Sequence, residues 1–171
     1  MSATLKFPKI SSHPEIQERI DAYNRLSDLH QAIVHILAII YSPTARTNIL
    51  NSLKKLYDGD AAIKRFKVCD LDPILDHLAE QGLVEQAEMY FECQPFLKET
   101  ICRLLVDNDR FGDVAVAVQQ AIPISPIRFG IYSFPNYDLM FREIRISIYL
   151  GDVGDADQGP AGGSRCNRVA W

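Results

Sequence analysis

The chain has 171 residues, a formal net charge of −4, and a composition that is 47% hydrophobic and 23% charged. This length suits one domain, or one small domain with a helical appendage, and the composition is that of a globular protein rather than a disordered one. The negative charge excludes the overall basic field that draws many nucleic-acid-binding proteins to phosphate, so any contact of that kind needs a local basic patch.

The amino-terminal part of the chain combines an irregular arm with helical patterns. Residues 1–26 are predicted to be an arm followed by a lead-in helix from Pro14. Ser27 is a suitable N-cap for a helix over 27–41, which is apolar on nearly all sides and is therefore expected to be buried. Its run of apolar residues, 32–41, is interrupted by His35 and is too short to cross a bilayer, so we expect no membrane segment.

A second helix is predicted over 43–57, with Ser42 as its N-cap and Pro43 in its first turn. After a break at 58–60, the segment 61–69 is expected to carry a short strand around Phe66 and Val68.

The next segment has the clearest pattern in the chain. A helix is predicted over 70–81, ended by Gly82, and followed by a β-hairpin over 83–95 with its turn near Glu88. The helix has two nearly opposite stripes, an apolar one and an acidic one, so the acids are expected to face outward. These stripes are Leu71, Ile74, Leu75 and Leu78, and Asp72, Asp76 and Glu80.

The remaining sequence predicts a helical extension over 96–152 and a disordered, glycine-rich tail over 153–171. Pro95 can begin one helix, and a second helix is favoured within 107–123. Alternating valines in that segment make a strand the alternative. The proline-rich stretch 122–136 is expected to be a loop with one short strand. A last helix is predicted within 137–151, and a strand is the alternative for the carboxyl-terminal part of this segment. The apolar face of the predicted helix is Tyr137, Met140, Phe141, Ile144 and Ile148.

The order of three helices and a hairpin over 27–95 resembles the winged-helix family. Members end their third helix with two spaced leucines, a glycine and an apolar pair that begins the wing; the matching residues are Leu75, Leu78, Gly82, Leu83 and Val84. The resemblance implies a mainly α fold with a small β-hairpin, a winged helix-turn-helix domain followed by the helical extension. It also implies either DNA binding or protein–protein contact, between which the fold does not decide.

A second similarity covers residues 94–123 and 142–152. These segments resemble the amino-terminal accessory region of large bacterial SNF2-type helicase-related proteins. The chain has no GxxxxGK[ST] phosphate loop. The resemblance therefore implies a non-catalytic accessory part of a longer DNA-remodelling protein.

The charges indicate how such a domain would meet DNA. Acids on the helix over 70–81 would meet the phosphates with like charge, so sequence recognition by this helix is not expected. Weak, salt-sensitive contact with duplex DNA is expected from a basic patch instead, with the hairpin as a second contact. The alternative is ordinary surface charge, including pairing with Asp58 and Asp60. The residues of the predicted patch are Arg46, Asn48, Lys54, Lys55, Lys64, Arg65 and Lys67.

The acids Asp72, Asp76 and Glu80 have two further interpretations. They form either a solvated face or a surface for a protein partner or a second copy of the chain.

No pattern in the sequence indicates an enzyme, a cofactor or a small-molecule ligand. His30 and His35 are five residues apart on one helix and cannot form the i, i+4 pair of a metal site. No CxxC pair occurs, so we expect no metal site and reduced thiols in a cytoplasmic protein. The cysteines are Cys69, Cys93, Cys102 and Cys166.

Overall fold

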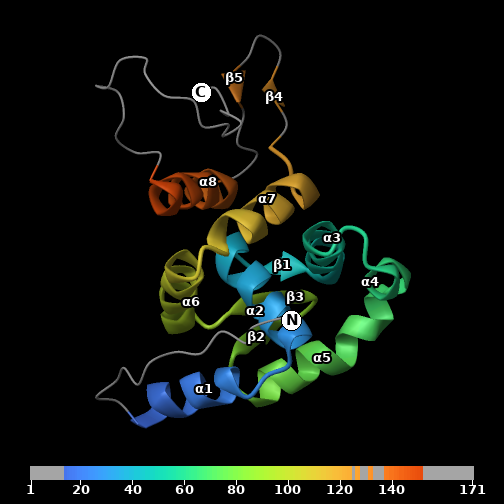
Figure 1. Cartoon of the computed structure of the whole chain (residues 1–171), viewed down its shortest axis with the longest axis vertical. Coiled ribbons are helices and arrows are strands. Elements are labelled where there is room, and N and C mark those ends of the chain that lie inside the picture. Colours follow the sequence, from blue (N-terminus) through green and yellow to red (C-terminus); the bar gives the residue numbers. More distant parts are fainter. Residues whose placement is uncertain (1–13, 125, 128–130, 133–136, 152–171) are drawn as a thin grey trace.

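A computed structural model describes residues 14–124, 126–127, 131–132 and 137–151. The described part is mainly helical, with a small three-stranded antiparallel sheet of order β1-β3-β2 (Figure 1). The expected fold class, mainly α with a small β-hairpin, is confirmed at this level. The arm over 1–13 and the tail over 153–171 lie outside the described residues.

The core of the molecule is built around α2 (Asp28–Ile40), which follows α1 (Pro14–Asn24). Ser27 is the N-cap of α2, as predicted, and its hydroxyl accepts a hydrogen bond from the His30 backbone N–H. Every residue from Gln31 to Ile40 is buried, because α2 contacts α3, α6, α7, α8 and β3. The prediction of a helix buried on nearly all sides is therefore confirmed.

The predicted start of the second helix is wrong. Ser42 and Pro43 do not begin it; Thr44 and Ala45 form the short strand β1, and α3 (Arg46–Leu56) follows directly. β1 pairs with β3, placing Thr44 opposite Phe91 and Ala45 opposite Tyr90. The partner strand lies more than forty residues later in the sequence. Pairing with this distant strand, and not a local sequence pattern, holds the backbone of Thr44 and Ala45 in an extended conformation.

The short strand predicted around Phe66 and Val68 is also wrong. A five-residue helix, α4 (Ala61–Arg65), occupies this segment, and Val68 begins α5 (Val68–Glu80). The Asp60 carboxylate caps α4 by accepting hydrogen bonds from the backbone N–H groups of Ala62 and Ile63, at 2.7 and 3.2 Å. An aspartate N-cap followed by two alanines favours a helical turn over a strand.

The exit from α5 into the hairpin follows the prediction. Gly82, with a φ of +65°, follows the C-cap of the helix; its N–H donates to the Ala79 carbonyl, and the Leu83 N–H donates to the Leu78 carbonyl. These two bonds form a Schellman motif. The strands β2 (Val84–Ala87) and β3 (Tyr90–Cys93) then form the hairpin, and Glu88 in the turn has a φ of +55°.

The carboxyl-terminal elements are α6 (Pro95–Asp107), α7 (Phe111–Ala121), the paired strands β4 (Pro126–Ile127) and β5 (Ile131–Tyr132), and α8 (Tyr137–Leu150). The helices favoured over strands at 107–123 and 137–151 are therefore confirmed. Where one short strand was expected in 122–136, two are found. α7 packs on α3 and α2, and α8 packs on α6 and α7 (Figure 1).

Candidate functional site

Five of the predicted basic residues lie where α3, α4 and α5 meet, and we call them the basic corner: Lys54, Lys55, Lys64, Arg65 and Lys67. In Figure 1 the end of α3, α4 and the start of α5 are neighbours at the right-hand edge, and α3 contacts both of the other helices. Four of the five side chains are exposed, and Lys54 is half-buried. The structure therefore places the helix ends that carry these cations next to one another.

Nearby acids reduce the positive charge of the basic corner. The Asp58 carboxylate lies 3.8 Å from the Lys64 ammonium, and both side chains are well exposed. Asp60 is held by the backbone of α4, and the Asp70 carboxylate accepts a 2.7 Å hydrogen bond from the Lys67 backbone N–H. Five cations thus face three carboxylates, two of which are bound to helix amino termini, where they offset the helix dipoles.

Arg46 and Asn48, also predicted in the patch, lie near the opposite end of α3 and are engaged within the fold. The Arg46 Nε donates to Asp72 Oδ1 at 2.6 Å, and the guanidinium lies over the Phe91 ring at 4.5 Å from its centroid. Asn48 donates to the Thr44 hydroxyl at 3.0 Å. These contacts connect α3 to α5 and to the sheet, so the two side chains are not oriented for an external ligand.

The acids of α5 face outward largely as their spacing in the sequence predicts. Asp76 and Glu80 are exposed, whereas Asp72 is partly neutralised by Arg46. The hairpin adds two exposed acids, Glu85 and Glu88. The spacing of the acids along α5 does not predict these two residues, because they lie outside the helix. We call Asp76, Glu80, Glu85 and Glu88 the acidic residues of α5 and the hairpin. Both elements that a winged helix would present to DNA therefore carry negative charge outward.

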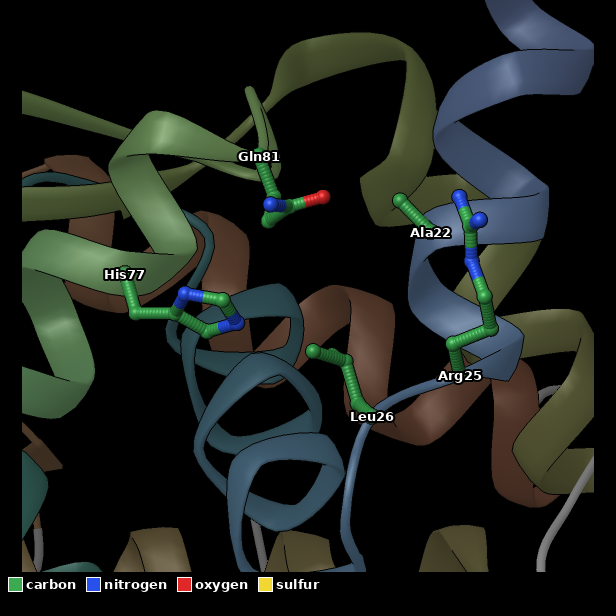
Figure 2. Close-up of a pocket in the computed structure, with 5 residues that line it drawn as sticks. All are labelled: Ala22, Arg25, Leu26, His77 and Gln81. Atoms are coloured by element: carbon green, nitrogen blue, oxygen red, sulfur yellow. The ribbon is translucent and has the colours of Figure 1, made fainter.

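A small hollow lies between the end of α1 and the end of α5. Its volume is about 280 Å³, near the lower limit for small-molecule sites. Figure 2 shows Gln81 and His77 on one side and Ala22 and Arg25 opposite; the lining residues are Ala22, Arg25, Leu26, His77 and Gln81. These side chains supply one imidazole, one guanidinium and one amide, without a hydroxyl, a thiol or a carboxylate. No local pattern in the sequence indicates this hollow, because its two walls are about fifty residues apart.

Three buried titratable side chains of the core, Tyr23, His35 and Cys102, have structural partners. The Tyr23 hydroxyl and His35 Nε2 are 2.6 Å apart in the core, and burial lowers the pKa of His35 to about 3. Burial also raises the pKa of the Cys102 thiol to about 12, and its Sγ is 3.8 Å from the Ala38 carbonyl oxygen. These groups stay neutral at physiological pH and hold α1 and α6 against α2.

Within the described ranges, no group of three or more His, Cys, Asp or Glu side chains could hold a metal ion. The same residues include no helix with the length and apolar character needed to span a membrane. No family model, curated protein or solved structure matches the chain. The function is therefore inferred from the surfaces of the molecule.

Proposed function

We propose that residues 27–95 are a non-enzymatic winged-helix module that associates with nucleic acid through the basic corner. The order α2, α3, α5 and hairpin supports this fold assignment. The exit from α5 supports it as well, because Leu75, Leu78, Leu83 and Val84 are all buried around Gly82 with its positive φ. These residues are the ones that carry the family resemblance in the sequence. Such a module would serve a transcriptional regulator or an accessory domain of a DNA-remodelling protein.

The observation that carries the proposal is the gathering of five cations from three elements. Lysine and arginine side chains that approach phosphates release condensed counterions, which gives affinity without sequence recognition. The partly compensating carboxylates of Asp58, Asp60 and Asp70 limit that affinity. We therefore expect weak duplex binding that falls steeply with salt concentration.

The charge of α5 and the hairpin shapes the proposed binding geometry. Asp76 and Glu80 would oppose insertion of α5 into a groove, and Glu85 and Glu88 would oppose contact through the hairpin. In the proposed arrangement the duplex lies along the basic corner alone. The hairpin, Arg46 and Asn48 lie outside this proposed interface, in contrast to the expectation from the sequence.

The test is fluorescence anisotropy with a random-sequence duplex over a series of KCl concentrations. Since each phosphate contact contributes a slope of about −0.9 in log affinity against log salt, the wild type should give a slope between about −3 and −5. Lys54→Glu combined with Lys64→Glu should weaken binding at least roughly tenfold and flatten the slope by about 2.

The matched control is Arg25→Glu combined with Arg103→Glu, which changes the net charge equally at two exposed arginines, one just after α1 and one on α6. This control should weaken binding much less. An equal loss in both double variants would show that net charge, and not the basic corner, governs the interaction. Wild-type affinity that is independent of salt would refute the proposal.

A second candidate function is binding of a basic protein surface, which the exposed acids of both α5 and the hairpin favour. Asp76→Lys combined with Glu80→Lys separates the two candidates in the same assays. If the basic corner binds DNA, this variant binds the duplex as well as the wild type or better. If the acids are the functional surface, binding of a lysine-rich peptide is lost in this variant and the duplex is not bound by the wild type.

A further inference from the structure

The helix α8 exposes an apolar stripe to solvent. Tyr137, Phe141, Ile144 and Ile148 have exposed fractions of 77%, 54%, 40% and 57%. At 100° per residue these four positions fall within a narrow sector of the helix. Buried Arg142, Glu143 and Ile146 lie on the other side. We call the four exposed residues the α8 stripe.

Polar contacts fix α8 in this orientation. The buried Arg142 guanidinium donates to the Ile122 carbonyl at 2.9 Å and pairs with Glu143 at 2.6 Å, and Gln119 of α7 donates to the same glutamate. From the other flank, Glu99 of α6 accepts from Tyr149 and pairs with Arg145. Turning the stripe inward would break these contacts and leave charged groups in apolar surroundings. The exposure of the stripe is therefore specified by the fold.

We propose that the α8 stripe is the interface of a homodimer in which α8 packs antiparallel against α8 of a second copy. The stripe has the spacing 4, 3, 4, which is the spacing of a seam between two packed helices. A groove for an extended peptide or for a small ligand would not require this helical repeat.

The order of side chains along the stripe identifies the occupant as a second copy. Both aromatic residues lie in the amino-terminal half, and both isoleucines lie in the carboxyl-terminal half. Antiparallel pairing places Tyr137 opposite Ile148 of the partner subunit and Phe141 opposite Ile144 of the partner subunit. Every layer then combines one large and one smaller side chain, so the stripe is complementary to itself under a twofold axis.

The exposed area sets the expected strength of the dimer. The four side chains expose on the order of 400 Å² per copy, which is within the range of functional apolar patches. With the flanking atoms, a pair of stripes would bury about 1,000 Å², the lower limit for a specific interface. We therefore expect a dissociation constant in the micromolar range.

The proposed dimer does not depend on the proposed nucleic-acid function. The α8 stripe is carried by a helix that packs on α6 and α7, whereas the basic corner lies on α3, α4 and the start of α5 (Figure 1). No residue is shared between the two surfaces, so either proposal can fail without the other. If both hold, avidity strengthens binding wherever the two basic corners of the dimer reach the same duplex.

Sedimentation velocity from about 1 to about 100 µM tests the dimer. The wild type should change from monomer to dimer over this range, and Ile144→Glu should remain a monomer throughout. Met89→Glu, which replaces a 69% exposed apolar side chain in the hairpin turn, should behave as the wild type. A monomeric wild type at the highest concentration, or an Ile144→Glu variant that still dimerises, would overturn the proposal.

Two further experiments test the dimer independently of Ile144→Glu. Tyr137→Lys alters the most exposed position of the stripe and should weaken the dimer at least tenfold even if Ile144→Glu fails to fold. The relative orientation of the two α8 helices is tested in chains whose Cys69 and Cys166 are replaced by serine. Phe141→Cys chains are mixed with Ile144→Cys chains and oxidised. The antiparallel arrangement predicts mainly mixed disulfides, and an excess of the two homodisulfides would overturn it.

Discussion

His35 shows how a single buried side chain makes the stability of this fold sensitive to pH. Its imidazole is 5% exposed and lies 2.6 Å from the Tyr23 hydroxyl, so it connects α2 to α1. Burial, and secondly the charge of Arg110, lower the pKa of His35 from 6.5 to about 3. The folded protein therefore keeps His35 neutral over a pH range in which the unfolded chain protonates it.

The sign of the pH effect follows from this lowered pKa. Because the folded pKa is below the unfolded one, stability is fully present above pH 6.5 and is lost as the pH falls toward about 3. Between pH 7 and pH 5 the loss from His35 should be about 2 kcal/mol. His35→Gln removes this contribution, so its destabilisation relative to the wild type should be about 2 kcal/mol smaller at pH 5 than at pH 7.

Urea unfolding at the two pH values measures this difference. The matched control is Tyr23→Phe, which removes the same hydrogen bond but retains the titrating imidazole, and its destabilisation should not shrink at pH 5. An unchanged penalty for His35→Gln at the two pH values would show that this imidazole is not the source of the pH dependence.

The residues of the candidate site could be predicted only in part from the sequence. Runs of basic residues near the end of α3 and in α4 are visible as local patterns, and the two helices that carry Lys54 and Lys64 contact each other in the structure. The engagement of Arg46 was not predictable, because its partner Asp72 is 26 residues away and no local spacing connects them. Side chains with distant partners are therefore the ones that sequence patterns assign least well.

At the scale of single elements, the end of α5 depends on the backbone conformation of Gly82. Its φ of +65° is in the left-handed region, where a side chain is strained, and the adjacent N–H groups complete the Schellman motif. A Cβ at this position would lie 3.3 Å from the Arg19 Nε, the far end of a flexible side chain. The cost of substitution therefore comes mainly from the backbone.

We predict that Gly82→Ala lowers the free energy of unfolding by about 1 kcal/mol. Gly82→Asn should cost clearly less, because asparagine tolerates the left-handed conformation better than alanine does. Chemical denaturation of both variants, monitored by circular dichroism, tests the prediction. Equal losses for the two substitutions would indicate crowding by the side chain rather than backbone strain.

The elements that the sequence predicted well have strong local signals. Helical periodicity identified α2 and α5, and the glycine exit identified the hairpin. The elements that were missed are short: β1 has two residues that are extended by pairing with Phe91 and Tyr90, and α4 is one capped turn. α8 shows a third kind of difference. Its apolar face was visible in the sequence, but Arg142 and Glu143 decide which side packs inward, and their partners are on α7 and just beyond its end.

At the scale of the whole molecule, one hydrophobic core joins the segment 27–95 to the helical extension. The core includes Ile33 and Leu37 of α2 together with Ile101 of α6 and Val118 of α7, all with no exposed surface. α7 also packs on α3. The extension therefore covers the faces of α2 and α3 that the sheet and α5 leave open.

A chain that ends at residue 95 should consequently fail to fold cooperatively. Removing α6, α7 and α8 would expose several fully buried side chains of α2 and α3, each worth about 1.5–3 kcal/mol, against a total stability of about 5–15 kcal/mol for a domain. We expect no sigmoidal urea transition for this chain. A chain ending at residue 151 retains every described element and should unfold in one transition. A cooperative transition in the shorter chain would show that residues 27–95 form an independent domain and that the extension only docks on it.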